Sequence, residues 1–303
     1  MPRTNKVCLA AIAALASAVG LANAETIYGV TDAGALVRFD SATPGALTNI
    51  GTVTGLLTGH TTRGIDFRPF NGELYLISTD STGGTAQLYT VNLSNAALTP
   101  MGASFALTGN TSVRVSMDFN PAADRLRIVT ADTVENNFRW NPVTNAFVQA
   151  DASLLYDAGD PNSSTNPPFV AGVAYDRNDN DPTTGTTLYA YDFDLDDFST
   201  IGSPNGTPVS PNAGTMFTIG NAGIVTTSAS FGFDISISGV AYVNANVATN
   251  DNLYTVNLST GQLTLVGSLG TTMLDISAVV PEPASLGLVG LSLAGLVRRP
   301  RRA

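Results

Sequence analysis

The chain has 303 residues, of which 14 are basic, 24 acidic, one histidine and one cysteine. Two terminal segments are set aside below; residues 25–280 then keep 8 basic against 23 acidic side chains, a net charge of −15. Such a surface repels phosphate backbones and anionic lipids, so nucleic-acid binding is disfavoured. Residues 25–280 contain no cysteine, no lysine and a single histidine, which excludes thiol catalysis, Schiff-base lysines and histidine-rich zinc sites.

Residues 1–24 are typical of a secretory signal peptide. Arg3 and Lys6 precede an apolar run over residues 7–21, and Ala22-Asn23-Ala24 supplies the small-x-small pattern that signal peptidase cleaves. Cys8 lies before the apolar run rather than at the cleavage point, which argues against a lipoprotein. The remaining alternative is an uncleaved membrane anchor.

The first strands of the mature chain are predicted at residues 26–30, 35–39 and 46–51. Each is a short run rich in β-branched or aromatic residues, and turn residues separate the runs. They correspond to the second, third and fourth strands of a four-stranded unit that lacks its first strand.

Two kinds of repeat run through residues 64–276. The heptapeptide at residues 88–94 recurs letter for letter at 253–259, with the two-residue alternation of a half-buried strand. A shorter element recurs five times at intervals of 41 to 60 residues. Its copies are Gly64-Ile65-Asp66-Phe67, Ser116-Met117-Asp118-Phe119, Gly172-Val173-Ala174-Tyr175, Gly232-Phe233-Asp234-Ile235 and Met273-Leu274-Asp275-Ile276. About four strands per repeat of this length is the pattern of a propeller blade.

The last copy of the element, around Asp275, has no room for further strands before the C-terminal tail. We therefore predict that it supplies the strand missing from the first unit and closes an all-β, five-bladed propeller, because closure removes costly sheet edges. A β-sandwich with coincidental similarity is the alternative.

The motifs that open the units resemble a bacterial family catalogued as domain of unknown function 4394. The resemblance rests on residues 64–69 with 71–75, on residues 118–127 and on residues 231–236, and it covers most of 26–275. It implies a secreted protein, and it brings no known catalytic residues. Ala174 departs from the pattern, because the other copies have Asp at that position.

The recurring aspartates at positions 66, 118, 234 and 275 allow two interpretations. If the first strand of each blade is innermost, the carboxylates lie near the central channel. They then either accept hydrogen bonds from backbone amides of the neighbouring blade, which is the favoured interpretation, or bind a cation or a sugar. Arg63 and Arg114, which precede two of the motifs, are candidates to pair with these carboxylates.

The segment 176–181 is the candidate calcium loop. Asp176, Asn178 and Asn180 place oxygen ligands at alternate positions, as a calcium loop requires. The segment is not an EF-hand, because Asp181 and Thr187 stand where that motif needs glycine and glutamate. The alternative is a solvated acidic turn.

Three other features are weaker candidates for function. Residues 192–198 alternate acidic and apolar side chains, which predicts a charge-protected edge strand or a second cation site. Residues 157–168 form a loop by composition, either a connector or part of a binding rim. His60 would be needed for a Ser-His-Asp triad, but no Gly-x-Ser-x-Gly motif occurs, which argues against one.

Residues 281–303 resemble the PEP-CTERM sorting tail. Pro281-Glu282-Pro283 is followed by an apolar stretch over 284–297 and by an arginine cluster ending at Arg302. The apolar stretch is short for a membrane span, yet the arginines mark a cytoplasmic stop. The resemblance implies recognition and removal of the tail by an exosortase in a Gram-negative, exopolysaccharide-producing bacterium. An ordinary C-terminal anchor is the alternative.

Together these features predict a signal peptide (1–24), a propeller domain (25–280) and a sorting tail (281–303). We expect an exported cell-surface or extracellular-matrix protein, anchored transiently in the inner membrane. It is expected to be a binding or structural protein, with exopolysaccharide or other matrix proteins as its partners, rather than an enzyme. The alternative is an extracellular hydrolase or lyase that works through carboxylates, with calcium as its candidate cofactor.

Overall fold

The computed structural model describes residues 24–107, 114–131, 137–227, 230–247 and 251–280. The predicted signal peptide lies outside this part of the chain except for Ala24, which is exposed. Ala22 and the Pro281-Glu282-Pro283 motif also lie outside it. No helix in the described ranges is both long enough and apolar enough to cross a membrane.

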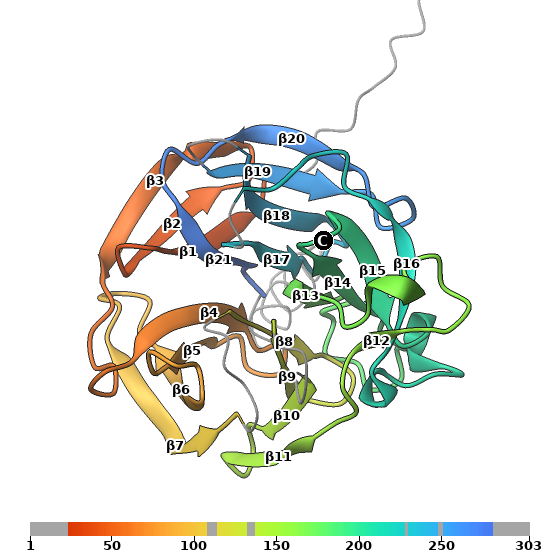
Figure 1. The fold of residues 1–303 in the computed structure, drawn as a ribbon. Coiled ribbons are helices and arrows are strands. Elements are labelled where there is room, and N and C mark those ends of the chain that lie inside the picture. Colours follow the sequence, from red (N-terminus) through yellow and green to blue (C-terminus); the bar gives the residue numbers. More distant parts are fainter. Residues whose placement is uncertain (1–23, 108–113, 132–136, 228–229, 248–250, 281–303) are drawn as a thin grey trace, which may run out of the picture.

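The described chain forms five sheets arranged around one axis (Figure 1). Blade 1 consists of β21 (Met273–Ala278), β1 (Thr26–Thr31), β2 (Ala35–Asp40) and β3 (Thr43–Thr52). Blade 2 consists of β4 (Thr61–Phe67), β5 (Leu74–Thr79), β6 (Thr85–Val91) and β7 (Leu98–Ala106). Blade 3 consists of β8 (Val115–Asn120), β9 (Arg125–Thr130), β10 (Asn137–Asn141) and β11 (Ala146–Ala150).

Blades 4 and 5 complete the circle. Blade 4 consists of β13 (Val170–Tyr175), β14 (Leu188–Asp192), β15 (Asp197–Ile201) and β16 (Thr215–Asn221), with β12 (Leu155–Tyr156) parallel to β16 at its outer edge. Blade 5 consists of β17 (Gly232–Ile235), β18 (Ala241–Asn246), β19 (Asp251–Val256) and β20 (Leu263–Ser268). Three short 3-10 turns lie in the connections: η1 (Ser163–Thr165), η2 (Pro204–Gly206) and η3 (Pro211–Ala213).

The predicted ring closure is confirmed. The C-terminal strand β21 pairs antiparallel with β1, and Tyr28 lies opposite Ser277 in that pairing. Blade 1 is thus built from both ends of the domain, so its sheet exists only when the whole chain has folded.

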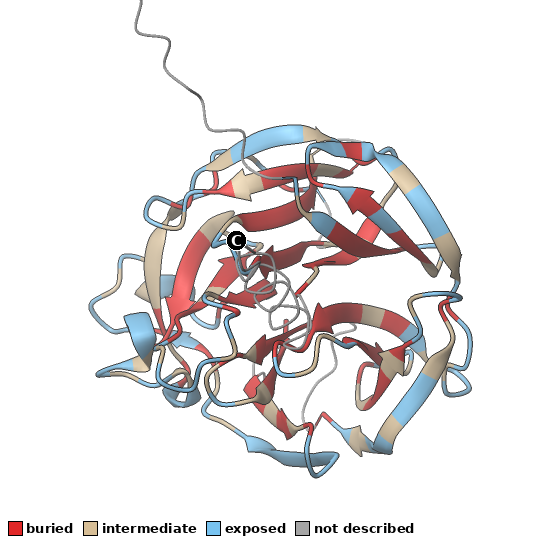
Figure 2. Cartoon of the chain, turned by 180° about the vertical axis from the view of Figure 1, so that it is seen from behind, coloured by how far each residue is buried: buried red, intermediate tan, exposed pale blue. Residues whose placement is uncertain are grey.

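Five hydrophobic cores hold the ring together, one at each interface between neighbouring blades. Inner strands such as β13 are buried along their whole length, whereas the outer strand β11 is exposed throughout (Figure 2). Each blade therefore buries both faces only against its neighbours, and no blade has a core of its own.

The heptapeptide repeat falls at the same place in two blades. Its copies form the ends of β6 and β19, the third strands of blades 2 and 5, and the turns that follow them. Asn92 Oδ1 accepts a hydrogen bond from Ser94 N at 2.9 Å, and Asn257 Oδ1 accepts one from Ser259 N at 3.0 Å. The sequence is repeated because it encodes a strand together with its asparagine-closed turn.

The prediction of one acidic strand over residues 192–198 is wrong. The segment is the hairpin between β14 and β15, with Asp196 at φ +52° in the turn. Asp192 is buried and accepts the hydroxyl of Tyr156 at 2.9 Å, and Asp196 accepts that of Tyr191 at 2.5 Å. The acidic residues here serve the turn rather than an edge, because aspartate accepts local hydrogen bonds readily.

Candidate functional site

The candidate site lies on the propeller axis, where aspartates of the innermost strands meet. Asp66 is on β4, Asp118 on β8, Asp234 on β17 and Asp275 on β21. All four are buried, with at most 5% of each residue exposed. We call these four residues the aspartate ring.

Each carboxylate of the ring pins its own blade to the next blade in the circle. In each case the carboxylate accepts a hydrogen bond from a backbone N–H of the next blade: Asp66 from Phe119 at 2.7 Å, Asp118 from Tyr175 at 2.9 Å, Asp234 from Ala278 at 2.6 Å and Asp275 from Ile65 at 2.9 Å. This confirms the favoured interpretation of the repeated aspartate.

Blade 4 has Ala174 in place of the aspartate and reaches blade 5 differently. The side chain of Asn178 donates from Nδ2 to the carbonyl of Ile235 at 2.6 Å. Gly172 lies against blade 5, where an added Cβ would come within 2.8 Å of the Phe231 ring. An amide and a close backbone approach therefore replace the missing carboxylate.

The glycines of the motif make room for the carboxylates. A Cβ at Gly64 would lie 2.9 Å from Asp275 Oδ2, and a Cβ at Gly232 would lie 2.6 Å from Asp275 Oδ1. Asp275 fits between blades 2 and 5 only because both neighbours lack a side chain at these positions.

None of the ion pairs among the described residues includes a ring aspartate. The predicted pairing of Arg63 and Arg114 with the ring carboxylates is wrong. Arg63 Nε donates to Thr79 Oγ1 at 2.8 Å, and the Arg114 guanidinium lies 5.7 Å from the ring centres of Phe169 and Phe193.

Burial and mutual repulsion favour the protonated form of these carboxyls. Burial raises the pKa of Asp234 to about 6. Burial, and then the charge of Asp234, raises the pKa of Asp66 well above its ordinary value. For Asp118 the causes of the raised pKa are burial and then the charge of Asp66. The site therefore resists carrying several negative charges at once.

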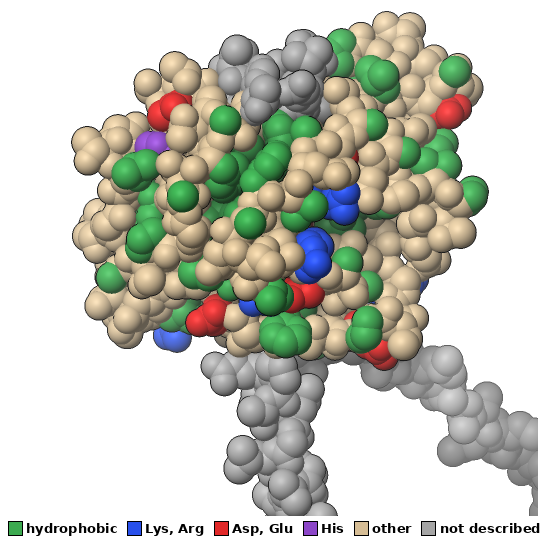
Figure 3. Space-filling view, turned by 90° about the horizontal axis from the view of Figure 1, so that it is seen from below, with side chains coloured by type: hydrophobic (Ala, Val, Ile, Leu, Met, Phe, Trp, Pro, Cys, Tyr) green, Lys and Arg blue, Asp and Glu red, His purple; other side chains and the backbone are tan. Residues whose placement is uncertain are grey.

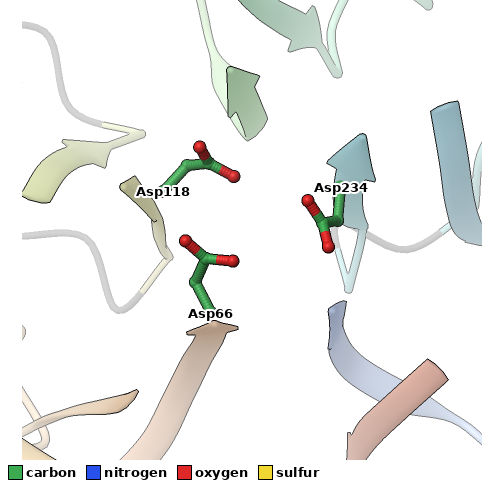
Figure 4. A group of neighbouring side chains, drawn as sticks. All are labelled: Asp66, Asp118 and Asp234. Carbon is green, nitrogen blue, oxygen red and sulfur yellow. The ribbon is translucent and has the colours of Figure 1, made fainter. Parts of the chain in front are cut away.

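Three members of the ring form a group that can hold a metal ion. Asp66, Asp118 and Asp234 each offer one carboxylate oxygen, and these oxygens lie within 4.8 Å of one another. Their carboxylates point toward a common space from three different blades (Figure 4). The sequence placed these residues near the channel, but only the fold brings this particular trio together.

Two of the predicted calcium ligands, Asp176 and Asn178, make hydrogen bonds within the protein. Asp176 Oδ1 accepts Thr187 N at 2.7 Å, and Asn178 makes the blade contact described above. Asn180 lies in the following turn with φ +56°. Calcium at Asp176, Asn178 and Asn180 stays a prediction.

His60 and the loop over residues 157–168 have structural partners. His60 Nδ1 lies 3.0 Å from Ser78 Oγ. In the loop, Asp160 Oδ2 accepts Thr218 N at 2.7 Å, which fastens the loop to β16. The loop is therefore fastened to the outer part of blade 4, and its role in a binding rim stays a prediction.

An arginine cavity of about 200 Å³ was missed by the sequence reasoning. Arg125, Arg127 and Arg139 line it, together with Tyr175 and Asn212 among others. The signal was present, since Arg125 and Arg127 are two apart on one strand and so share a face. What the sequence lacks is the register, which sets Arg139 of β10 opposite Arg127 of β9.

The arginine cavity carries excess positive charge. The side chain of Asp151 is fully buried and accepts hydrogen bonds from Arg127 Nη1 at 2.7 Å and Arg139 Nε at 2.6 Å. Burial alone would raise the pKa of Asp151, but hydrogen bonds from Arg139 and Gln149 and the charge of Arg127 hold it below its ordinary value. One carboxylate is thus paired with two guanidinium groups, which leaves positive charge in excess. Arg125 Nη1 donates a hydrogen bond to the backbone oxygen of Asp124 at 2.7 Å.

Comparison with protein families identifies two regions of the chain. Residues 35–278 match the model of the domain of unknown function DUF4394, so the chain belongs to that family. Residues 279–302 match the PEP-CTERM protein-sorting motif. A tail of this kind marks a protein exported to the cell envelope or surface of a Gram-negative bacterium and processed by an exosortase.

Solved structures share the fold. A bifunctional GH43-CE protein of Bacteroides eggerthii matches with a TM-score of 0.50 and 12% identity, covering 85% of this chain and 34% of its own. The allergen Mala s 1 of Malassezia sympodialis matches with a TM-score of 0.45 and 10% identity, covering 86% and 77%. A chain of a nidogen/laminin complex matches with a TM-score of 0.44 and 11% identity, covering 84% and 98%. These likenesses concern the fold alone. The search of curated proteins found no match.

Proposed function

We propose that this exported DUF4394 propeller is a non-catalytic component of the cell surface or extracellular matrix that binds acidic exopolysaccharide. The observation that carries the proposal is the arginine cavity, a local excess of positive charge in a domain whose net charge is −15. The PEP-CTERM tail, which sends the protein to the envelope, supports the location.

The chemistry of the arginine cavity suits a carboxylate on a sugar. A guanidinium offers planar, paired N–H donors that match a carboxylate, and Tyr175 and Asn212 add neutral polar groups. Figure 3, which shows the molecule from below the view of Figure 1, has basic side chains at the surface among apolar and acidic ones. A polymer with regularly spaced carboxylates can contact such a site from outside.

The hydrolase or lyase alternative has weaker support. Catalysis by paired carboxylates needs two groups that a glycosidic bond can reach. The aspartate ring is buried and engaged with backbone amides, so a polymer has no access to it.

The test is binding of the purified protein to polyuronates, with neutral dextran as comparison, at two salt concentrations. Arg125→Gln should weaken polyuronate binding about tenfold or more, because a hydrogen bond to a charged group contributes about 1.5–3 kcal/mol. Arg38→Gln removes the same charge from an exposed position of β2 and is the matched control. Equal binding to dextran, or no binding to any polysaccharide, would contradict the proposal.

A further inference from the structure

Three carboxylates converge on the propeller axis, and none of them forms an ion pair with a basic residue of the described ranges. Asp66, Asp118 and Asp234 come from blades 2, 3 and 5, and their nearest oxygens lie within 4.8 Å of one another (Figure 4). An acidic cluster alone is common, so a site needs a second observation.

That observation is an unpartnered oxygen. Asp234 is 2% exposed, and its Oδ1 has no hydrogen-bond partner, although its Oδ2 accepts from both Ala278 N and Ser277 Oγ. A buried carboxylate oxygen without a partner costs free energy. The carboxylate of Asp234 points toward Asp66 and Asp118, so the atom that fills this space would contact all three residues (Figure 4).

The hydroxyl of Ser277 cannot satisfy both of the carboxylates that it contacts in the same place. Its oxygen lies 3.0 Å from Asp66 Oδ1 and 3.0 Å from Asp234 Oδ2, and it also accepts Phe67 N at 3.1 Å. A hydroxyl carries one proton, so it can donate to only one of the two carboxylates at a time. The other carboxylate needs a positive partner or a proton of its own.

We propose that Asp66, Asp118 and Asp234 bind one calcium ion on the propeller axis. Three carboxylates are hard oxygen ligands, and Ca²⁺ accepts several of them in a flexible geometry. Mg²⁺ keeps several waters and is usually bound by only one or two carboxylates, so three carboxylates on one site suit Ca²⁺ better. Asp275 takes no part, because Ile65 N and Ile276 N engage its two oxygens, both at 2.9 Å.

The ion links three blades of the propeller across its axis. Blades 2 and 3 are neighbours, but blade 1, which is assembled from both chain ends, lies between blade 5 and blade 2. A cation bound by β4, β8 and β17 joins these blades directly. This role is independent of the arginine cavity and of any bound polysaccharide.

The test measures calcium bound to the purified full-length protein and its melting temperature at pH 7.5, in EDTA and in millimolar Ca²⁺. We expect one ion per chain and a rise in melting temperature of about 5 °C or more with Ca²⁺. Asp234→Asn should abolish both. Asp251→Asn is the matched control, since Asp251 is also fully buried with an unpartnered Oδ1 but lies on β19 outside the trio.

The outcomes separate the site from a general effect of buried charge. A wild-type protein without bound calcium, or an Asp234→Asn protein that keeps it, would overturn the proposal, and so would loss of binding in Asp251→Asn. If Asp234→Asn does not fold, Asp118→Asn and the wild-type stoichiometry decide the matter. Calcium binding without polysaccharide binding would leave this site standing and reject only the proposed function.

Discussion

Closure of the ring by β21 gives the sharpest test of the fold. Ile276 lies on β21 opposite Gly29 of β1, and only 1% of it is exposed. Its side chain belongs to the core between blades 5 and 1, together with Phe39 and Leu253 among others. Replacing Ile276 by alanine therefore removes contacts to both ends of the domain at once.

The expected cost follows from this burial. An Ile→Ala change in a packed core lowers the free energy of unfolding by about 2–5 kcal/mol. For a domain of this size each kcal/mol corresponds to about 2–4 °C, so the melting temperature should fall by about 10 °C. Removing residues 271–280 altogether should prevent stable folding, because blade 1 would lose its inner strand.

Thermal and urea unfolding, followed by circular dichroism, measure the effect of Ile276→Ala. Leu265→Ala on the outer strand β20 is the matched control, because Leu265 is 60% exposed and its truncation should cost less than about 0.5 kcal/mol. If both variants melted alike, or if the chain lacking residues 271–280 kept the melting temperature of the whole protein, closure of the ring would not be what stabilises it.

Two further predictions concern the axis. Since burial raises the pKa of Asp234 to about 6, the folded state binds more protons than the unfolded state between about pH 4 and pH 6. Stability measured in EDTA should therefore fall over that window as pH rises, with roughly 3 kcal/mol of the fall due to Asp234, and Asp234→Asn should make the fall smaller. A pH-independent wild-type profile in EDTA would refute this. Gly232→Ala should lower the free energy of unfolding by several kcal/mol, because the added Cβ would lie 2.6 Å from Asp275 Oδ1. Gly159→Ala in the outer loop is the control, since its Cβ would meet only Asp157 Oδ1, at 3.3 Å. Equal melting temperatures of the two variants would show that the residues around Gly232 can shift to accommodate the added atom.

The local patterns predicted the strands well and the side-chain partners poorly. Residues 88–94 and 253–259 carry the alternation of a strand and the asparagine that closes its turn, and both properties are encoded within a few residues. The alternation over residues 192–198 was misleading, because an aspartate at a positive φ looks the same in sequence as an aspartate on a strand. Arg63 was assigned to the wrong partner because residues three apart on a strand face opposite sides. Arg114 precedes the start of β8, and its guanidinium lies over Phe169 and Phe193, which are far away in the sequence.

The sequence alone determined the number of blades, the closure of the ring and the place of the repeated aspartates on the innermost strands. It could do so because each blade repeats the same local pattern and because an open sheet edge is costly. Only the tertiary structure decided which carboxylates meet on the axis, that Asp234 keeps an oxygen without a partner and that three arginines of blade 3 line one cavity. Those facts depend on strand register and on distances between blades that are far apart in the chain, and no local pattern of residues specifies either.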